Sequence, residues 1–165
     1  MLQILVWGGS FFLLAVMGEP ITRDTGWAAH WVYGSLSLSL MVAALLAPLS
    51  SRLVARHGGR VQLACSGAIV AFGLLLVASS QSLAWFMLAW GVIGVGMACG
   101  LYETLFATLG ALYAERAGKA IIGITLISGF ATTLSWPLVA LAIEYMGWRQ
   151  TCVAYALLLL VVVAP

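Results

Sequence analysis

Charged side chains are scarce in this chain of 165 residues. They make up 7% of it, against about 25% in an ordinary soluble domain. Hydrophobic residues reach 64%, and the mean hydropathy is +1.12. A water-soluble fold of this size has too much surface to cover with so few polar groups. The excess apolar surface must therefore face a lipid bilayer, and the small net charge of +2 gives no reason to expect a nucleic-acid partner.

The sequence also lacks the motifs of metal centres and hydrolases. Its three cysteines, Cys65, Cys99 and Cys152, lie singly within apolar runs, and there is no Cys-x-x-Cys pair or Cys/His cluster. Neither H-E-x-x-H nor G-x-S-x-G occurs, and no two acids share an apolar run. We therefore expect no metal, no cofactor and no enzyme activity. A membrane-embedded enzyme is the less favoured alternative.

Long apolar runs account for most of the chain. A helix needs about 20 apolar residues to cross a hydrocarbon core of about 30 Å. The runs are continuous, without the alternation that a barrel strand requires, so helices are predicted. We expect one all-α integral membrane domain over 1–165, a six-helix bundle whose sixth helix is truncated, with helices at about 2–20, 30–50, 61–79, 83–112, 120–143 and 149–165.

Short connections carry almost all of the charge, at Glu19–Ala29, Ser51–Arg60, Ser79–Ser82, Ala114–Lys119 and Glu144–Arg149. One side of the membrane would hold Arg52, Arg56, Arg60, Arg116 and Lys119, and the other only Arg23 and Arg149. Basic residues in short loops favour the cytoplasm. This predicts a multi-pass protein of the cell (inner or plasma) membrane with a cytoplasmic amino terminus.

Four tryptophans lie near the opposite, outer ends of the predicted helices, at Trp27, Trp31, Trp85 and Trp148. Indole rings favour the membrane interface, which predicts an outer aromatic belt. The alternative is that some of them pack inside the bundle. The glycines of the fourth run, Gly91, Gly94, Gly96 and Gly100, predict a flat face for close helix packing.

The second connection reads Ser51-Arg52-Leu53-Val54-Ala55-Arg56-His57-Gly58-Gly59-Arg60. It resembles the loop signature G-x-L-x-D-R-x-G-R-R of the major facilitator superfamily, with Ser51 at the first glycine and Ala55 at the acid. Gly26-Trp27, the glycine-rich fourth run, Trp136-Pro137 and Gly147-Trp148-Arg149 are also similar to that superfamily.

The resemblance covers the whole chain but corresponds to the amino-terminal half of a twelve-helix transporter. It implies a missing carboxy-terminal half or a second copy as partner. Trp90 stands where proton-coupled members of the superfamily often carry an arginine, and Ser128-Gly129 does not supply the G-P-x-x-G-G motif of drug/proton antiporters. Both of these subtypes are therefore disfavoured. The Gly-Trp and Trp-Pro features look more like the branch of monocarboxylate and oxalate/formate carriers.

One acid, Glu103, lies well inside an apolar run, beside Tyr102. An ionised acid costs several kcal/mol in hydrocarbon unless it is paired, protonated or hydrated. The hypothesis is that Glu103 binds a coupling proton, a cation or a cationic substrate group. A structural ion pair near the cytoplasmic end is the alternative.

Hydroxyl residues recur along the fifth run at three- and four-residue steps, at Thr125, Ser128, Thr132 and Ser135. This spacing places them on one helix face, where they could line a polar cavity. Small hydroxyl residues also let helices approach closely, so packing is the alternative. Trp136 lies one turn from Thr132 and could stack on a substrate, and Pro137 predicts a kink.

In the superfamily, the second cytoplasmic loop helps to hold the inner gate shut. The resemblance therefore implies a gate at Ser51, Arg52, Arg56, Gly58 and Arg60, with Glu115 as an acidic partner; a positive-inside topology signal explains the arginines equally well. The sequence thus predicts alternating-access transport of a small polar or organic-anion solute. A non-transporting assembly or regulatory subunit is the alternative.

Overall fold

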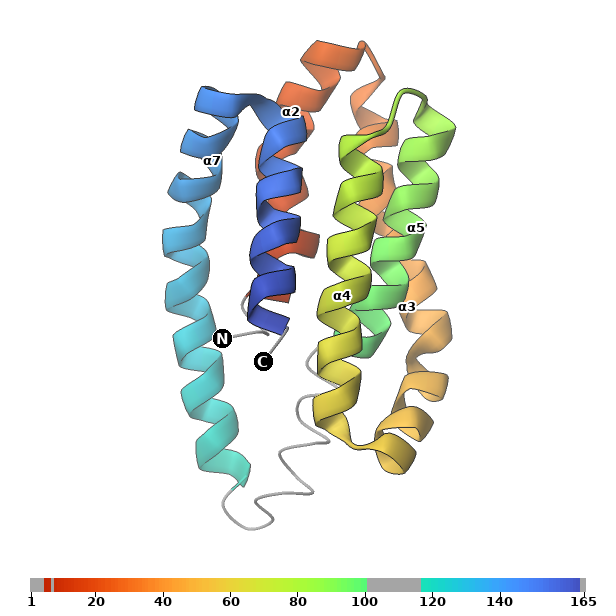
Figure 1. Ribbon diagram of the computed structural model, residues 1–165, viewed down its shortest axis with the longest axis vertical. Helices are drawn as coiled ribbons and strands as arrows, with labels where there is room; N and C mark the ends of the chain where they lie inside the picture. The colour runs from red at the N-terminus through yellow and green to blue at the C-terminus, as the bar shows by residue number, and fades with distance from the viewer. Residues whose placement is uncertain (1–4, 7, 101–116, 164–165) are drawn as a thin grey trace.

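The structure is a computed structural model that describes residues 5–6, 8–100 and 117–163. Every regular element in these ranges is helical, in the order η1 (Gly8–Phe12), α2 (Leu13–Thr25), α3 (Ala29–His57), α4 (Gly59–Ala78), α5 (Leu83–Gly100) and α7 (Ala117–Val163). The helices lie side by side, roughly along one common axis (Figure 1). The prediction of an all-α protein is confirmed for the described residues.

Four helical stretches are long and apolar enough to cross a bilayer within the part of the chain that the structure describes. They are Ala29–Arg56, Val61–Ala78, Leu83–Gly100 and Trp136–Val162. At 1.5 Å per residue, the shortest of them extends about 27 Å, close to the thickness of the hydrocarbon core. Six membrane crossings stay a prediction, because α2 has 13 residues and residues 101–116 lie outside the described ranges.

The helices run further than the apolar runs do. Helix α2 continues through Glu19, Pro20 and Asp24 to Thr25, where a loop was expected. The expected connections Ser51–Arg60 and Glu144–Arg149 shrink to single non-helical residues, Gly58 and Gly147. Apolarity marks only the part of a helix that lies in lipid. A helix satisfies its own backbone hydrogen bonds, so it can extend beyond that part into the interface.

Glycine with positive φ marks three of the breaks between helices. Gly26, Gly58 and Gly147 have φ angles of 70°, 80° and 79°. The backbone N–H of Gly58 donates to the Val54 carbonyl over 2.9 Å, which closes the last turn of α3. Side chains with a Cβ rarely adopt these angles, so glycine allows each sharp reversal.

Helix α5 packs against α3 and α4, and α4 also packs against α7. Four side chains of α5 are fully or almost fully buried, those of Phe86, Trp90, Ile93 and Met97. The flat glycine face that the sequence predicted is instead two faces. A Cβ on Gly94 would lie 2.6 Å from the Ser39 carbonyl oxygen on α3, whereas one on Gly96 would lie 2.6 Å from Val70 on α4. Two residues turn a helix by about 200°, so these glycines serve opposite neighbours.

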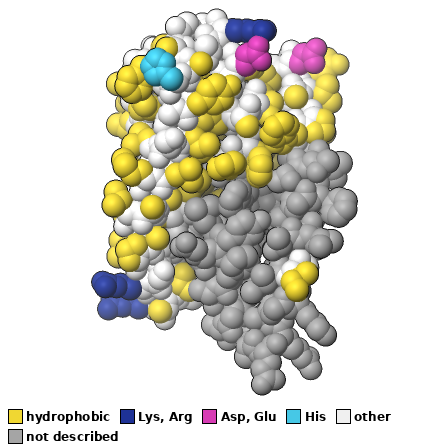
Figure 2. Space-filling model, turned by 180° about the vertical axis from the view of Figure 1, so that it is seen from behind, with side chains coloured by type: hydrophobic (Ala, Val, Ile, Leu, Met, Phe, Trp, Pro, Cys, Tyr) yellow, Lys and Arg dark blue, Asp and Glu magenta, His cyan; other side chains and the backbone are white. Residues whose placement is uncertain are grey.

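On the face that Figure 2 shows, the charged side chains of the described residues lie at the two ends. Figure 2 shows lysine or arginine side chains at one end, acids, a histidine and further basic groups at the other, and hydrophobic side chains between them. Helix α3 contributes a large part of this apolar surface, with exposed Met41, Leu45 and Leu49. This distribution fits a protein whose middle lies in lipid and whose ends meet water.

Candidate functional site

The sequence-predicted site residues fall into two groups. Tyr102, Glu103 and Glu115 lie outside the described residues. Thr125, Ser128 and Thr132 lie on the helical backbone of α7, so their spacing keeps them on one helix face, but their side chains are outside the description. Trp136 is 49% exposed and does not line the cleft described below. A polar substrate cavity at these residues stays a prediction.

The predicted inner-gate segment is helical rather than a loop. Ser51, Arg52 and Arg56 lie in the last turns of α3, Gly58 is the break, and Arg60 lies in the first turn of α4. The Ser51 hydroxyl donates to the Ala47 carbonyl of its own helix over 3.1 Å. Arg52 and Arg56 are exposed, and neither has an acidic partner within the described ranges. The gate contact with Glu115 therefore stays a prediction.

A buried polar contact joins α3 and α4 at the same end of the bundle. The Gln62 side chain on α4 donates through Nε2 to the Ser50 carbonyl on α3 over 3.2 Å and also to the Ser50 hydroxyl. Both side chains are buried, at 6% and 4% exposure. This contact holds α3 and α4 together just inside the arginine-bearing turns. Sequence reasoning missed it, although Gln62 is a conspicuous polar residue at the start of an apolar run.

Serine hydroxyls bond across the helices around α5. Ser39 on α3 donates to the Trp90 carbonyl over 2.6 Å, and Ser66 on α4 donates to the Gly96 carbonyl over 2.8 Å. Both serines are fully buried. In a membrane, such a bond removes a hydroxyl from hydrocarbon and lets two backbones approach closely. Packing is thus the role of these two hydroxyls.

The end opposite the arginine-bearing turns holds a cluster that joins three helices. Trp148 Nε1 donates to Asp24 Oδ2 over 2.9 Å, which links α7 to the end of α2. Arg149 Nη1 donates to the carbonyls of Ala78 and Ser80 over 2.9 and 2.7 Å, at the carboxyl end of α4. The last carbonyls of a helix lack partners and carry partial negative charge, so a guanidinium suits this position.

Trp148 does not belong to an outer aromatic belt, which corrects the sequence-based expectation for this residue. Its side chain is 5% exposed, and the Arg149 guanidinium lies 4.2 Å from its ring centroid. Trp31 and Trp85, by contrast, are 49% and 44% exposed. Trp27 is half-buried and lies against Phe86 with ring centroids 5.4 Å apart. The expected belt therefore splits between surface and interior.

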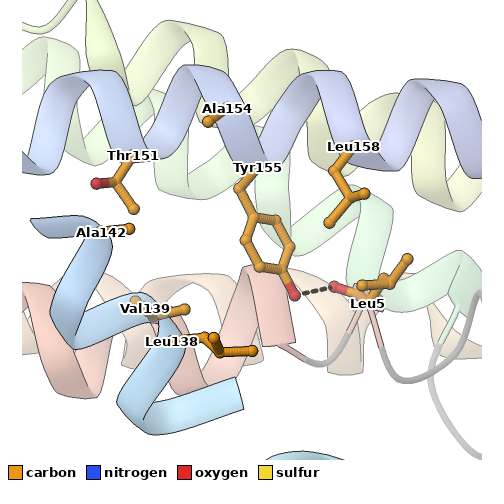
Figure 3. Close-up of a pocket in the computed structure, with 8 residues that line it drawn as sticks. All are labelled: Leu5, Leu138, Val139, Ala142, Thr151, Ala154, Tyr155 and Leu158. Atoms are coloured by element: carbon orange, nitrogen blue, oxygen red, sulfur yellow. Dashed lines mark hydrogen bonds between the residues drawn. The ribbon is translucent and has the colours of Figure 1, made fainter. Parts of the chain in front are cut away.

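A cleft of about 260 Å³ lies between the two arms of α7, residues 117–146 and 148–163, and the start of the chain (Figure 3). It is lined by Leu5, Leu138, Val139, Ala142, Thr151, Ala154, Tyr155 and Leu158. No described residue of the lining is charged. The Tyr155 hydroxyl points to the Leu5 carbonyl and donates to it over 3.0 Å, while the Thr151 hydroxyl is bonded to the Gly147 carbonyl.

Glycines of η1 make room for the Tyr155 ring at the edge of this cleft. A Cβ on Gly9 would lie 2.7 Å from the ring carbon Cε1, and Gly8 also faces the phenol. The segment Gly8–Phe12 is a π-helix, a widened turn that is often found at functional sites. No motif in the sequence points to the cleft, because its lining residues come from three separate apolar stretches.

Over the described residues, these features define an all-helical, multi-pass membrane bundle with its charge at two ends and an apolar middle. No protein-family model matches the chain, and no solved structure matches it. The chain is 33% identical over 146 residues to the chloramphenicol resistance protein CraA of Acinetobacter baumannii. The match covers 85% of this chain and 34% of that protein, so the chain spans about a third of its relative's length. This similarity does not address the monocarboxylate or oxalate/formate branch.

Proposed function

We propose that this chain is the amino-terminal part of a secondary transporter of the major facilitator superfamily that works by alternating access. The observation that carries the proposal is the similarity to CraA, since it extends over 85% of the chain rather than over one motif. The four long apolar helices and the arginine-bearing break at Gly58 support it independently. A membrane enzyme and a non-transporting subunit have no comparable support.

The solute that the sequence favours is a small polar or organic-anion compound, carried by a protein of the monocarboxylate or oxalate/formate type. The relative's name favours a second candidate, export of a neutral antibiotic such as chloramphenicol. The uncharged lining of the cleft also agrees better with a neutral compound. An anion there would lose its hydration without gaining a counter-charge, which is costly in an apolar site.

Three further parts of the proposal rest on the sequence. The amino terminus lies in the cytoplasm of a cell whose inner or plasma membrane holds the protein. A carboxy-terminal half, or a second copy of this chain, completes the transport path. Glu103 binds a coupling proton, a cation or a cationic substrate group, so Glu103→Gln abolishes transport or uncouples it.

The test is expression of the complete reading frame that contains these 165 codons in a bacterial host made sensitive by loss of its own efflux pumps. Labelled chloramphenicol accumulation is measured in cells, and labelled monocarboxylate and oxalate uptake in inverted and right-side-out vesicles. Energy-dependent movement of either solute class supports transport and selects the substrate. Movement of neither, with the protein present in the membrane at normal levels, would refute the transport proposal for both classes.

A further inference from the structure

We infer that the cleft between the two arms of α7 is a binding site for a neutral, largely apolar ring compound that carries a hydrogen-bond donor. The inference deepens the second candidate function above and rests on it. It assigns the contact to residues that the sequence did not single out, chiefly Ala142, Ala154 and Tyr155.

The size of the cleft favours a small molecule. Its volume of about 260 Å³ lies just below the range for drug-sized ligands, about 300–1,000 Å³, which suits a small compound. Ala142 on one arm and Ala154 on the other contribute only methyl groups, so the space between the arms is left open (Figure 3). Larger side chains at these two positions would fill it.

The chemistry of the lining selects the ligand class. Leu138, Val139 and Leu158 present hydrocarbon, which favours an apolar ring over a hydrated solute. The Tyr155 hydroxyl donates its hydrogen to the Leu5 carbonyl, so its oxygen keeps lone pairs that can accept a bond from a ligand. The Thr151 hydroxyl is bonded to the Gly147 carbonyl of its own helix and points away from the cleft (Figure 3). The Tyr155 hydroxyl therefore offers the acceptor, and the ligand must supply the donor.

The surroundings provide a route into the cleft from the bilayer. Leu138 is 67% exposed and Leu158 is 46% exposed, and both belong to the span Trp136–Val162. An apolar compound dissolved in the membrane can therefore reach the site without crossing water. A charged compound partitions poorly into that phase and meets no counter-charge among the described lining residues.

The test uses the complete protein in membranes and the neutral antibiotic of the export assay as probe. Ala142→Phe and Ala154→Phe each place a ring in the cleft, and Ala140→Phe is the matched control, since Ala140 is exposed on the same arm and does not line it. Both cleft variants should weaken binding by about tenfold or more, with the control unchanged. Equal weakening in the control, or full binding in both cleft variants, would overturn the site.

Thiol labelling tests the same site without a bulky substitution. In Ala154→Cys, bound antibiotic should slow maleimide labelling of the introduced thiol several-fold, while labelling of the exposed Cys65 in the same molecules stays constant. Equal rates with and without antibiotic would overturn the inference. So would protection by phospholipid or fatty acid alone, because the cleft would then be a lipid site. If every cleft variant exports the antibiotic at the wild-type rate, the binding site is refuted and the transport proposal still stands.

Discussion

Trp148 and Asp24 are 124 positions apart, yet the indole Nε1 and the carboxylate Oδ2 are hydrogen-bonded over 2.9 Å. The indole is buried and the carboxylate is exposed, so the bond lies at the boundary between the bundle and water. It fixes the start of the second arm of α7 to the end of α2. Several measurable consequences come from this contact and from others like it.

Removal of the Asp24 carboxylate should destabilise the bundle. In Asp24→Ala, the buried Trp148 N–H loses its acceptor, which costs about 1–3 kcal/mol. In Asp24→Asn, the side-chain carbonyl can still accept, so most of the stability should remain. Thermal unfolding of the protein in detergent measures both. Glu19→Ala is the control, because it removes only an exposed ion pair with Arg23, and exposed pairs contribute little. Equal losses for all three variants would contradict the role of the bond.

Arg149 should tolerate lysine poorly. Its guanidinium donates to two carbonyls at the end of α4 and also lies over the Trp148 ring. Lysine keeps the positive charge but not the planar, forked group of donors. Arg149→Lys should therefore lose part of the stabilisation that Arg149 provides, whereas Arg149→Met should lose all of it. The expected loss for Arg149→Met is about 2 kcal/mol, typical of hydrogen bonds to a charged group. Unfolding temperatures of the three proteins at one detergent concentration give the ranking, and a lysine variant as stable as wild type would contradict it.

Two glycines of α5 form a matched pair. Gly94→Ala places a methyl group 2.6 Å from the Ser39 carbonyl oxygen and 2.9 Å from Ser39 Cα, so α3 and α5 must move apart. At Gly91 an added Cβ would have no atom of another described helix within 4 Å, so Gly91→Ala should be neutral, or more stable by up to about 1 kcal/mol through helix propensity. We expect Gly94→Ala to destabilise by about 1–3 kcal/mol through overpacking. Unfolding curves of the two variants measure this difference in stability. Equal stability of Gly94→Ala and Gly91→Ala would show that α3 and α5 are not in close contact at Gly94.

The hydroxyl of Tyr155 should stabilise the first helical segment. Tyr155→Phe keeps the ring against Gly9 and removes only the bond to the Leu5 carbonyl, for an expected loss of about 1 kcal/mol. Hydrogen exchange of the amides in Gly8–Phe12 should accelerate, while exchange in α4 should not change. Uniform acceleration along the chain would indicate a general loss of packing instead.

The orientation of the bundle can be read by labelling from one side. Ala55, near the arginines of α3, and Ala28, before its start, are both exposed and lie at opposite ends of that helix. If the positive-inside prediction holds, a membrane-impermeant maleimide labels Ala28→Cys in intact cells and labels Ala55→Cys only after permeabilisation. The opposite pattern would place the arginines outside and reverse the predicted topology.

The sequence could predict the helices because apolar runs without alternation leave few other structures in a membrane. It could not predict where they end, since Glu19 and Asp24 remain helical beyond the apolar run. The sequence also could not predict which helix each face of α5 packs against. Whether Gly94 faces α3 or α4 depends on the rotation of α5, which a run hydrophobic on all sides does not reveal.

The candidate site divides in the same way. Gly58 could be singled out from a loop signature, and the structure shows the positive φ that requires glycine there. The cleft could not be found, because Leu5, Ala142 and Tyr155 become neighbours only when α7 folds back on itself. Glu103 was evident as a lone acid in an apolar run, and it lies outside the described residues.

The single-residue joint at Gly147 restricts how the length of this chain can change. One inserted residue would rotate the second arm by about 100° about its own axis. Such a rotation would turn Trp148 away from Asp24 and Tyr155 away from Leu5 together. Insertions and deletions among relatives of this protein should therefore be absent at Gly147.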